Sequence, residues 1–143
     1  MKFNKSLFIM VMLTSLFLLI GCGNSADTGY KDGTYTAISS NDDKGAYGEV
    51  TITVKSGQIA DCKFITYQKD GKIKAEDYGK VNGVISNRDY YEKAQLSVRA
   101  MKKYAEDFKA AKSLKGVEAV TGATVSYNQF TEAVSKALSQ ANK

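Results

Sequence analysis

The sequence contains no histidine and no proline, and it has only two cysteines. Without histidine the chain cannot form a Ser-His or Cys-His nucleophile pair, and it has no imidazole general base. Histidine ligands to zinc or haem are excluded in the same way. These absences argue against an unassisted hydrolase. Because proline is missing, sharp changes of chain direction depend on the 12 glycines and on Asn, Asp and Ser.

The two cysteines, Cys22 and Cys62, limit the redox chemistry that the chain can perform. Residues 19–22, Leu-Ile-Gly-Cys, resemble a bacterial lipobox, so we expect cleavage before Cys22 and attachment of diacylglycerol to its sulfur. Cys62 is then the one remaining thiol, and neither an intramolecular disulfide nor a Cys-x-x-Cys pair can form. Cys62 lies in a strand-like run and is expected to be a small buried residue. A redox function therefore requires a bound cofactor.

Residues 1–21 are predicted to be a cleaved lipoprotein signal peptide. Lys2 and Lys5 supply positive charge ahead of an almost wholly apolar run over 7–20. An uncleaved membrane anchor is the alternative, but this run is shorter than the roughly 18–20 residues that cross a bilayer. Residues 22–29 are the lipidated cysteine and a tether of small and polar residues. We expect an extracytoplasmic protein, held by its lipid anchor at the cell surface or the periplasmic face of a membrane.

Removing the 21 residues of the signal peptide from the 143 leaves 122, the size of one domain, which we place over 30–143. The loss of Lys2 and Lys5 lowers the number of basic residues from 20 to 18 against 15 acidic ones, a formal charge of +3. No cluster of basic residues is interleaved with aromatics, so nucleic acid is not an expected partner. Asp42 and Asp43 do not match the spacing of a calcium loop and are expected to be solvated turn residues.

The middle of the chain alternates between apolar and polar residues, as half-buried strands do. We expect strands over 33–38, 48–55 and 58–67, with a tight turn between the last two. The apolar residues of 58–67 fall in both registers, which predicts a bulge or a strand covered on both faces. Residues 72–75 are a candidate fourth strand. Residues 76–86 are read as a loop over the sheet that forms part of a cofactor wall.

Two helices follow these strands. Asn87 or Ser86 can cap the first helix. Its apolar residues recur at spacings of four and three: Ala94, Val98, Met101, Ala105 and Phe108. The second helix carries the stripe Phe130, Val134, Leu138 and Ala141. We therefore predict an α+β fold, a single domain in which a small antiparallel sheet of three to four strands packs against two helices.

The stretch 116–126, Gly-Val-Glu-Ala-Val-Thr-Gly-Ala-Thr-Val-Ser, is the best candidate for a functional site. Ser126 and Gln129 have the Ser-x-x-Gln spacing of a capping box at the start of the second helix. Thr124 is therefore expected just outside the helix N-terminus, where free N–H groups and the helix dipole favour a phosphate. The Gly-Ala pair before it leaves little side chain in the way. A capped turn without a ligand is the simpler alternative.

Residues 121–124, Thr-Gly-Ala-Thr, resemble the flavinylation motif Ser/Thr-Gly-Ala-Thr of FMN-binding domains. Such domains occur in the C subunit of the sodium-pumping quinone reductase, the G subunit of the Rnf complex and small lipoproteins. The similarity extends over about residues 30–141, including Asp-Gly-Thr-Tyr-Thr at 32–36 and Gly48 ahead of the second strand. Glu118 stands where family members often have Asp, which is a conservative departure.

The resemblance implies that Thr124 carries FMN, esterified through the phosphate by an FAD-dependent flavin transferase. Thr121, Gly122, Ala123 and Ser126 would surround the attachment point and help to bind the cofactor.

Tyr47 is a further candidate on the same grounds. Residues 46–48, Ala-Tyr-Gly, resemble a Gly-aromatic-Gly element that lies close to the flavin in this family. Tyr47 either flanks the flavin ring or packs on its own sheet.

The implied function is that of a membrane-anchored electron carrier with covalent FMN, a redox shuttle rather than an enzyme with its own substrate. A quinone-linked membrane complex or an extracellular acceptor would be its redox partner. Two other functions fit the same residues. One is a non-flavinylated ligand-binding or surface-antigen lipoprotein of the same fold, and the other is a component that senses flavin noncovalently. No metal ligand and no catalytic residue is predicted.

Overall fold

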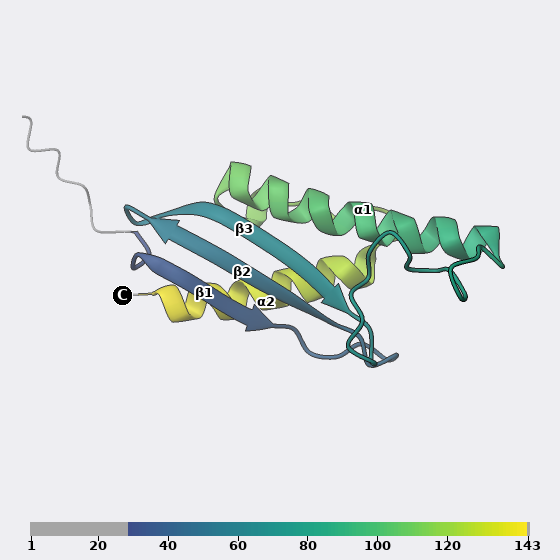
Figure 1. Ribbon diagram of the computed structural model, residues 1–143. Helices are drawn as coiled ribbons and strands as arrows, with labels where there is room; N and C mark the ends of the chain where they lie inside the picture. Colours follow the sequence, from purple (N-terminus) through teal and green to yellow (C-terminus); the bar gives the residue numbers. More distant parts are fainter. Residues whose placement is uncertain (1–28, 143) are drawn as a thin grey trace, which may run out of the picture.

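Three antiparallel strands form one sheet in the computed structural model, which describes residues 29–142 (Figure 1). The strands are β1 (Gly33–Ile38), β2 (Tyr47–Lys55) and β3 (Gln58–Tyr67), and they pair in the order β1-β2-β3. The alternation in β2 buries Val50, Ile52 and Val54 on one face, as the sequence pattern predicts. The predicted signal peptide and Cys22 lie outside the described residues.

A bulge between β2 and β3 explains why apolar residues of β3 fall in both registers. Thr53 pairs with Asp61 while the next residue, Val54, pairs with Ile59, so one residue of β3 has no partner. The extra residue turns both Ile59 and Cys62 toward the core. The predicted bulge is therefore confirmed, and Cys62 is a free, buried thiol.

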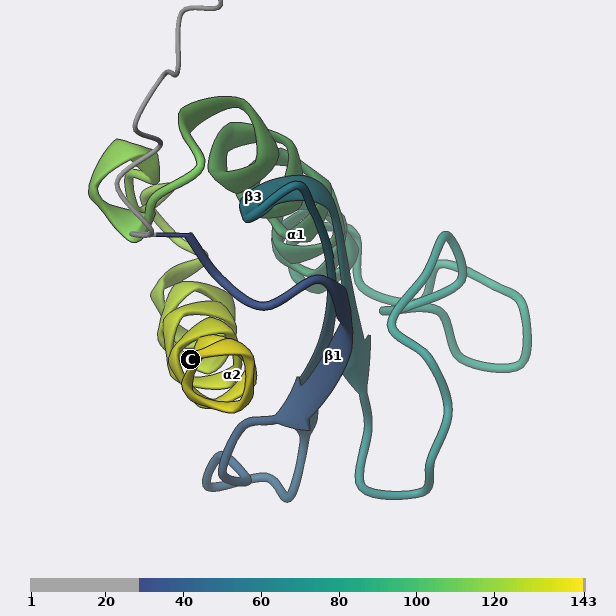
Figure 2. The same cartoon turned by 90° about the vertical axis from the view of Figure 1, so that its left-hand side faces the viewer.

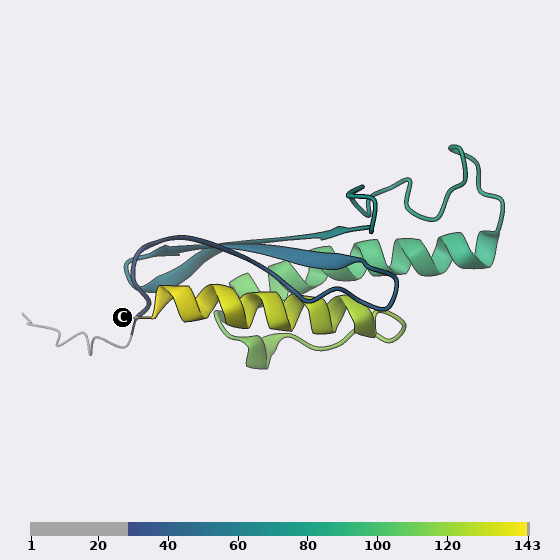
Figure 3. The same cartoon turned by 90° about the horizontal axis from the view of Figure 1, so that it is seen from below.

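Residues 72–75 meet the sheet only at the isolated bridge between Tyr67 and Ile73, so within residues 29–142 the sheet has three strands. The chain then turns toward the first helix. There the side-chain amide of Gln95 donates to the carbonyl oxygens of Ala75, Glu76 and Tyr78, at 3.2, 3.1 and 2.9 Å. The loop 76–86 therefore lies beside this helix at one end of the sheet, and the expectation that it runs over the sheet is wrong (Figures 1 and 3).

Helix α1 (Arg88–Ala111) begins as the sequence predicts. The side chain of Asn87 accepts a hydrogen bond from the N–H of Tyr90 at 2.9 Å, which satisfies one of the free donors of the first turn. The predicted apolar stripe faces the core, except that Val98 is only partly buried. Two further buried residues, Ala100 and Tyr104, widen that stripe.

Helix α2 (Thr124–Ala141) begins three residues earlier than predicted, because its N-cap is Ala123 and not Ser126. The residue at the cap is Ala123, which has no side-chain hydrogen bond to offer. Gln129 cannot complete a capping box either, since its Nε2 donates to the carbonyl oxygen of Ala46 at 3.0 Å. Thr124 is thus the first residue of the helix and not a residue outside it, and Ser126 lies in its first turn, 5% exposed.

Both helices cover the same face of the sheet (Figures 2 and 3). Helix α1 packs against β3, and α2 packs against β1 and β2. The largest fully buried side chains are Tyr104, Phe108 and Phe130, and they fill the space between the layers. The fold is therefore the predicted single α+β domain. No helix in residues 29–142 has both the length and the apolar character needed to cross a bilayer.

The two ends of the described chain meet at one end of the domain. The N–H of Tyr30 donates to the carbonyl oxygen of Gly57 at 3.0 Å, and the N–H of Lys31 donates to that of Ala141 at 2.8 Å. The loops before β2 and after β3 lie at the opposite end (Figure 1). The candidate site lies at this second end.

Candidate functional site

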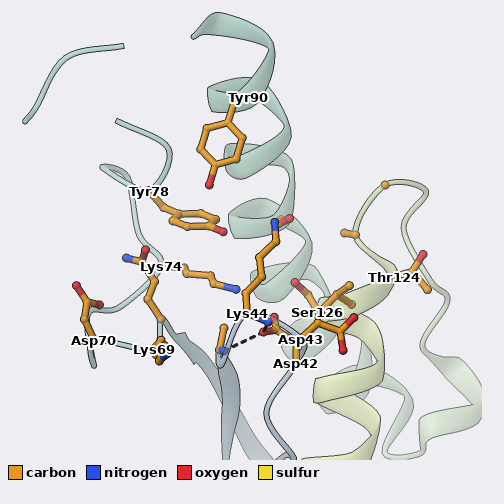
Figure 4. A pocket seen from close by; sticks show the side chains of 16 residues that line it. Asp42, Asp43, Lys44, Lys69, Asp70, Lys74, Tyr78, Tyr90, Thr124 and Ser126 are labelled. Atoms are coloured by element: carbon orange, nitrogen blue, oxygen red, sulfur yellow. Dashed lines mark hydrogen bonds between the residues drawn. The ribbon is translucent and has the colours of Figure 1, made fainter. Parts of the chain in front are cut away.

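A cavity of about 890 Å³ opens where β3 ends and where both helices begin (Figure 4). Its walls come from the loop between β1 and β2, the chain after β3, the first part of α1 and the start of α2. The lining residues are Asp42, Asp43, Lys44, Ala46, Gln68, Lys69, Asp70, Lys74, Tyr78, Tyr90, Ser97, Gly122, Ala123, Thr124, Val125 and Ser126.

A tight turn delivers the chain to the start of α2. The N–H of Ala123 donates to the carbonyl oxygen of Val120 at 2.9 Å, and Gly122 adopts a φ of 86° in between. A turn with this geometry requires a left-handed residue at its third position, where glycine is favoured. A Cβ at Gly122 would also lie 2.9 Å from Leu96 of α1. The Gly of the Thr-Gly-Ala-Thr motif is therefore needed both for the turn and for its contact with α1.

The hydroxyl of Tyr104 holds this turn from inside the core. It accepts a hydrogen bond from the N–H of Val120 at 3.0 Å and donates to the carbonyl oxygen of Ala123 at 3.3 Å. Tyr104 is fully buried, and burial raises its pKa, so the phenol stays neutral and can serve as donor. The sequence analysis missed Tyr104. Its spacing of four from Phe108 marks a buried helix position, but nothing local shows that its hydroxyl binds a loop 16 residues away.

The start of α2 presents unused hydrogen-bond donors to the cavity. The first N–H bonded within the helix is that of Tyr127, which donates to Ala123 at 3.1 Å, so the N–H groups of the three preceding residues have no helical acceptor. The hydroxyls of Thr124 and Ser126 form no hydrogen bond with another residue of 29–142. Thr124 is exposed and Ser126 is buried beneath it. Such a group of donors suits a phosphate.

The loop between β1 and β2 is shaped by Asp42. Its Oδ1 accepts hydrogen bonds from the N–H groups of Lys44 and Ala46, each at 2.9 Å. The expectation that Asp42 is a solvated turn residue is therefore wrong, because its carboxylate is half-buried and organises the loop. Asp43 is exposed, as expected.

The wall opposite the α2 turn is made by Lys74, Tyr78 and Tyr90 (Figure 4). The ammonium of Lys74 lies 5.3 Å from the centre of the Tyr78 ring. Burial, and after it the hydroxyl of Tyr90, raise the pKa of Tyr78 to about 12. Sequence analysis assigned none of these three to a site. It did predict that the loop 76–86 contributes to the wall, and this loop supplies Tyr78.

The structure brings four of the six predicted cofactor residues to the cavity: Gly122, Ala123, Thr124 and Ser126. Thr121 lies in the same turn but outside the cavity lining. Tyr47 is also outside the lining, and its ring stacks on that of Tyr67 with centroids 5.1 Å apart and planes at 20°. Of the two interpretations of Tyr47, this geometry fits packing on its own sheet. Among residues 29–142 no group of acidic, cysteine or histidine side chains is placed to hold a metal ion.

The chain matches a solved structure, the crystal structure of the CPE2226 protein from Clostridium perfringens, with 24% identity and a TM-score of 0.61 over 78% of this chain and 88% of that one. This likeness shows a shared fold. Among curated proteins there is no match. A family model described as the FMN-binding domain matches residues 44–139, a range that includes both sides of the cavity. The chain belongs to the FMN-binding domain family.

Proposed function

We propose that this protein is a lipid-anchored, extracytoplasmic electron carrier whose FMN is joined to Thr124 by a phosphoester. Membership of the FMN-binding family makes it a flavin-binding protein. The covalent bond, the location and the electron transfer are the parts that we add.

The residues of the cavity fit FMN. Its volume of about 890 Å³ lies within the range of roughly 300–1,000 Å³ that is usual for small-molecule sites. The free N–H groups at the start of α2 suit the phosphate, and the hydroxyl of Ser126 can join them. The rings of Tyr78 and Tyr90, on the other side, offer flat surfaces to an aromatic ring. One FMN molecule can thus contact both walls of the cavity.

The exposed hydroxyl of Thr124 is the observation that carries the proposal. It lies at the first position of α2, beyond a turn of small residues, and it is not engaged by another residue of 29–142. A transferase can reach such a hydroxyl. The ester forms between Thr124 Oγ1 and the FMN phosphate of FAD, the pyrophosphate bond of FAD breaks, and AMP leaves with the hydroxyl proton released.

Bound FMN supplies reversible uptake of electrons, and the protein supplies binding and orientation. In the described chain Cys62 is a buried thiol whose pKa is raised by burial to about 12, so it takes no part in redox exchange at neutral pH. The lipobox-like residues before Cys22 support the location outside the cytoplasm. A covalent link suits that location, because cofactor lost there is not easily replaced.

The proposal is tested by intact mass and by flavin fluorescence in a denaturing gel. The full chain is co-expressed with an FAD-dependent flavin transferase, together with the variants Thr124→Ala and Thr124→Ser. We expect the mass of one FMN less one water in the wild type, no gain in Thr124→Ala and retained attachment in Thr124→Ser. Ser135→Ala is the control, since it removes an exposed hydroxyl of the same helix that lies outside the motif and the cavity lining, and it should retain full attachment.

Two results would contradict the proposal. Covalent flavin on Thr124→Ala would place the ester elsewhere. A folded wild type that stays colourless would favour the non-flavinylated ligand-binding lipoprotein, and flavin that leaves on denaturation would favour a noncovalent sensor.

A further inference from the structure

Lys74 is a buried cation in the wall of the cavity. Its side chain is only 9% exposed, whereas Lys44 and Lys69, the other two lysines of the wall, are exposed. The backbone N–H of Lys74 donates to the carbonyl oxygen of Thr66 at 2.8 Å, which fixes this part of the chain to the end of β3. The position of Lys74 is therefore set by the sheet and not by a free loop.

Within residues 29–142 no carboxylate pairs with this ammonium, and it forms no hydrogen bond. The charged groups that act on this ammonium are Asp42, which favours the charged form, and Lys44, which opposes it. One oxygen of Asp42 is engaged by two backbone N–H groups. Besides the charge of Asp42, the ring face of Tyr78, whose centre lies 5.3 Å from the ammonium, favours the charged form. Burying an ammonium without a partner is costly. Burial accordingly lowers the pKa of Lys74, although the charge of Asp42 opposes this effect.

A buried cation that faces a ligand cavity calls for an anionic group on the ligand. Figure 4 shows Lys74 and Tyr78 on one side of the cavity and Thr124 on the other, with Lys44 and Ser126 between them. If the phosphate is fixed at Thr124, the part of FMN that reaches Lys74 is the ring at its far end. The ring is neutral when oxidised and can become an anion when reduced.

We infer that Lys74 compensates the charge of the reduced flavin ring and thereby raises the reduction potential of the bound FMN. This inference rests on the proposed attachment to Thr124. On reduction, the ring would take two electrons from an external reductant and one proton from the solvent. The ring is left with one negative charge, and the ammonium of Lys74 neutralises it. Tyr78 is a positioning residue, because it touches the ammonium and holds it toward the cavity.

The midpoint potential of the flavinylated full chain tests this role, measured by spectroelectrochemistry with dithionite as reductant. Lys74→Met keeps most of the length of the side chain and removes the charge. We expect the equilibrium constant for two-electron reduction to fall at least tenfold, which corresponds to about 30 mV. Lys74→Arg should restore most of the potential. Lys69→Met, which removes an exposed charge from the same cavity, should change it much less because water screens that charge.

Equal midpoint potentials for Lys74→Met and Lys69→Met would overturn the inference about Lys74. If every variant still carries covalent flavin, the proposal that FMN is attached to Thr124 is not affected by that result. A wild type without covalent flavin would instead refute the attachment. Lys74 can then be examined with free FMN and the unloaded chain by fluorescence titration. Our inference requires Lys74→Met to weaken the binding of reduced FMN more than that of oxidised FMN. Equal weakening of both forms would mean that Lys74 contacts the phosphate, and the inference would fail.

Discussion

Replacing Tyr104 with phenylalanine removes the one hydroxyl that holds the turn before α2. The N–H of Val120 then loses its acceptor, whereas the carbonyl oxygen of Ala123 keeps the N–H of Tyr127 as a donor. One partly buried donor is therefore left unsatisfied, at a cost of about 1–3 kcal/mol. The ring itself stays, so the packing against Phe130 is unchanged.

Urea unfolding of the chain without flavin measures this cost. For a slope of about 2 kcal/mol per molar urea, a loss of about 2 kcal/mol lowers the midpoint by about 1 M. Tyr35→Phe is the matched control, because it removes an exposed hydroxyl that donates to Lys31 at 2.7 Å and should cost less than about 0.5 kcal/mol. Equal midpoints for the two variants would refute the reasoning. Tyr104→Phe should also slow flavin attachment, since Thr124 follows directly on the loosened turn.

Three further predictions concern other parts of the fold. Gly48→Ala places a Cβ 2.6 Å from the ring of Phe64, so we expect overpacking to lower the unfolding free energy by about 1–3 kcal/mol, measured in urea. Cys62 should react with a thiol reagent at pH 8 only after denaturation, since burial raises its pKa to about 12; rapid modification of the native chain would contradict its buried position. The ion pair with Lys136 and the hydrogen bonds from Ser40 together lower the pKa of Glu132 to about 2. The stabilisation by this carboxylate is therefore present above the unfolded pKa of about 4.3 and is lost as the pH falls toward 2. Glu132→Gln should therefore be less stable than the wild type at pH 7, and a thermal melting difference that persists undiminished at pH 2 would argue against this pair.

The strands and the first helix could be predicted because their signals are local. The period of two in β2 and the cap at Asn87 each depend on residues a few positions apart. Even the bulge in β3 left a local trace, since a single unpaired residue shifts the apolar residues from one register to the other.

The errors arose where a distant residue decides the outcome. The Ser-x-x-Gln spacing indicated a capping box, but the carbonyl oxygen of Ala46, 83 residues away, takes the amide of Gln129. Lys74 and Tyr78 became site residues only because the chain after β3 folds back against α1, and no pattern within that loop specifies the contact. The motif around Thr124 and the contribution of the loop 76–86 to the wall could thus be found from the sequence, whereas the individual residues of that wall could not.

The hydrogen bond from the N–H of Lys31 to the carbonyl oxygen of Ala141 joins the two ends of the described domain, far from the cavity. A chain can therefore enter and leave this fold at almost the same point, the arrangement that tolerates insertion of a domain into another protein or its repetition in tandem. It also gives the experimenter two equivalent attachment points. A handle at either terminus can fix the domain to a solid support, such as an electrode, with the Thr124 end facing the solution.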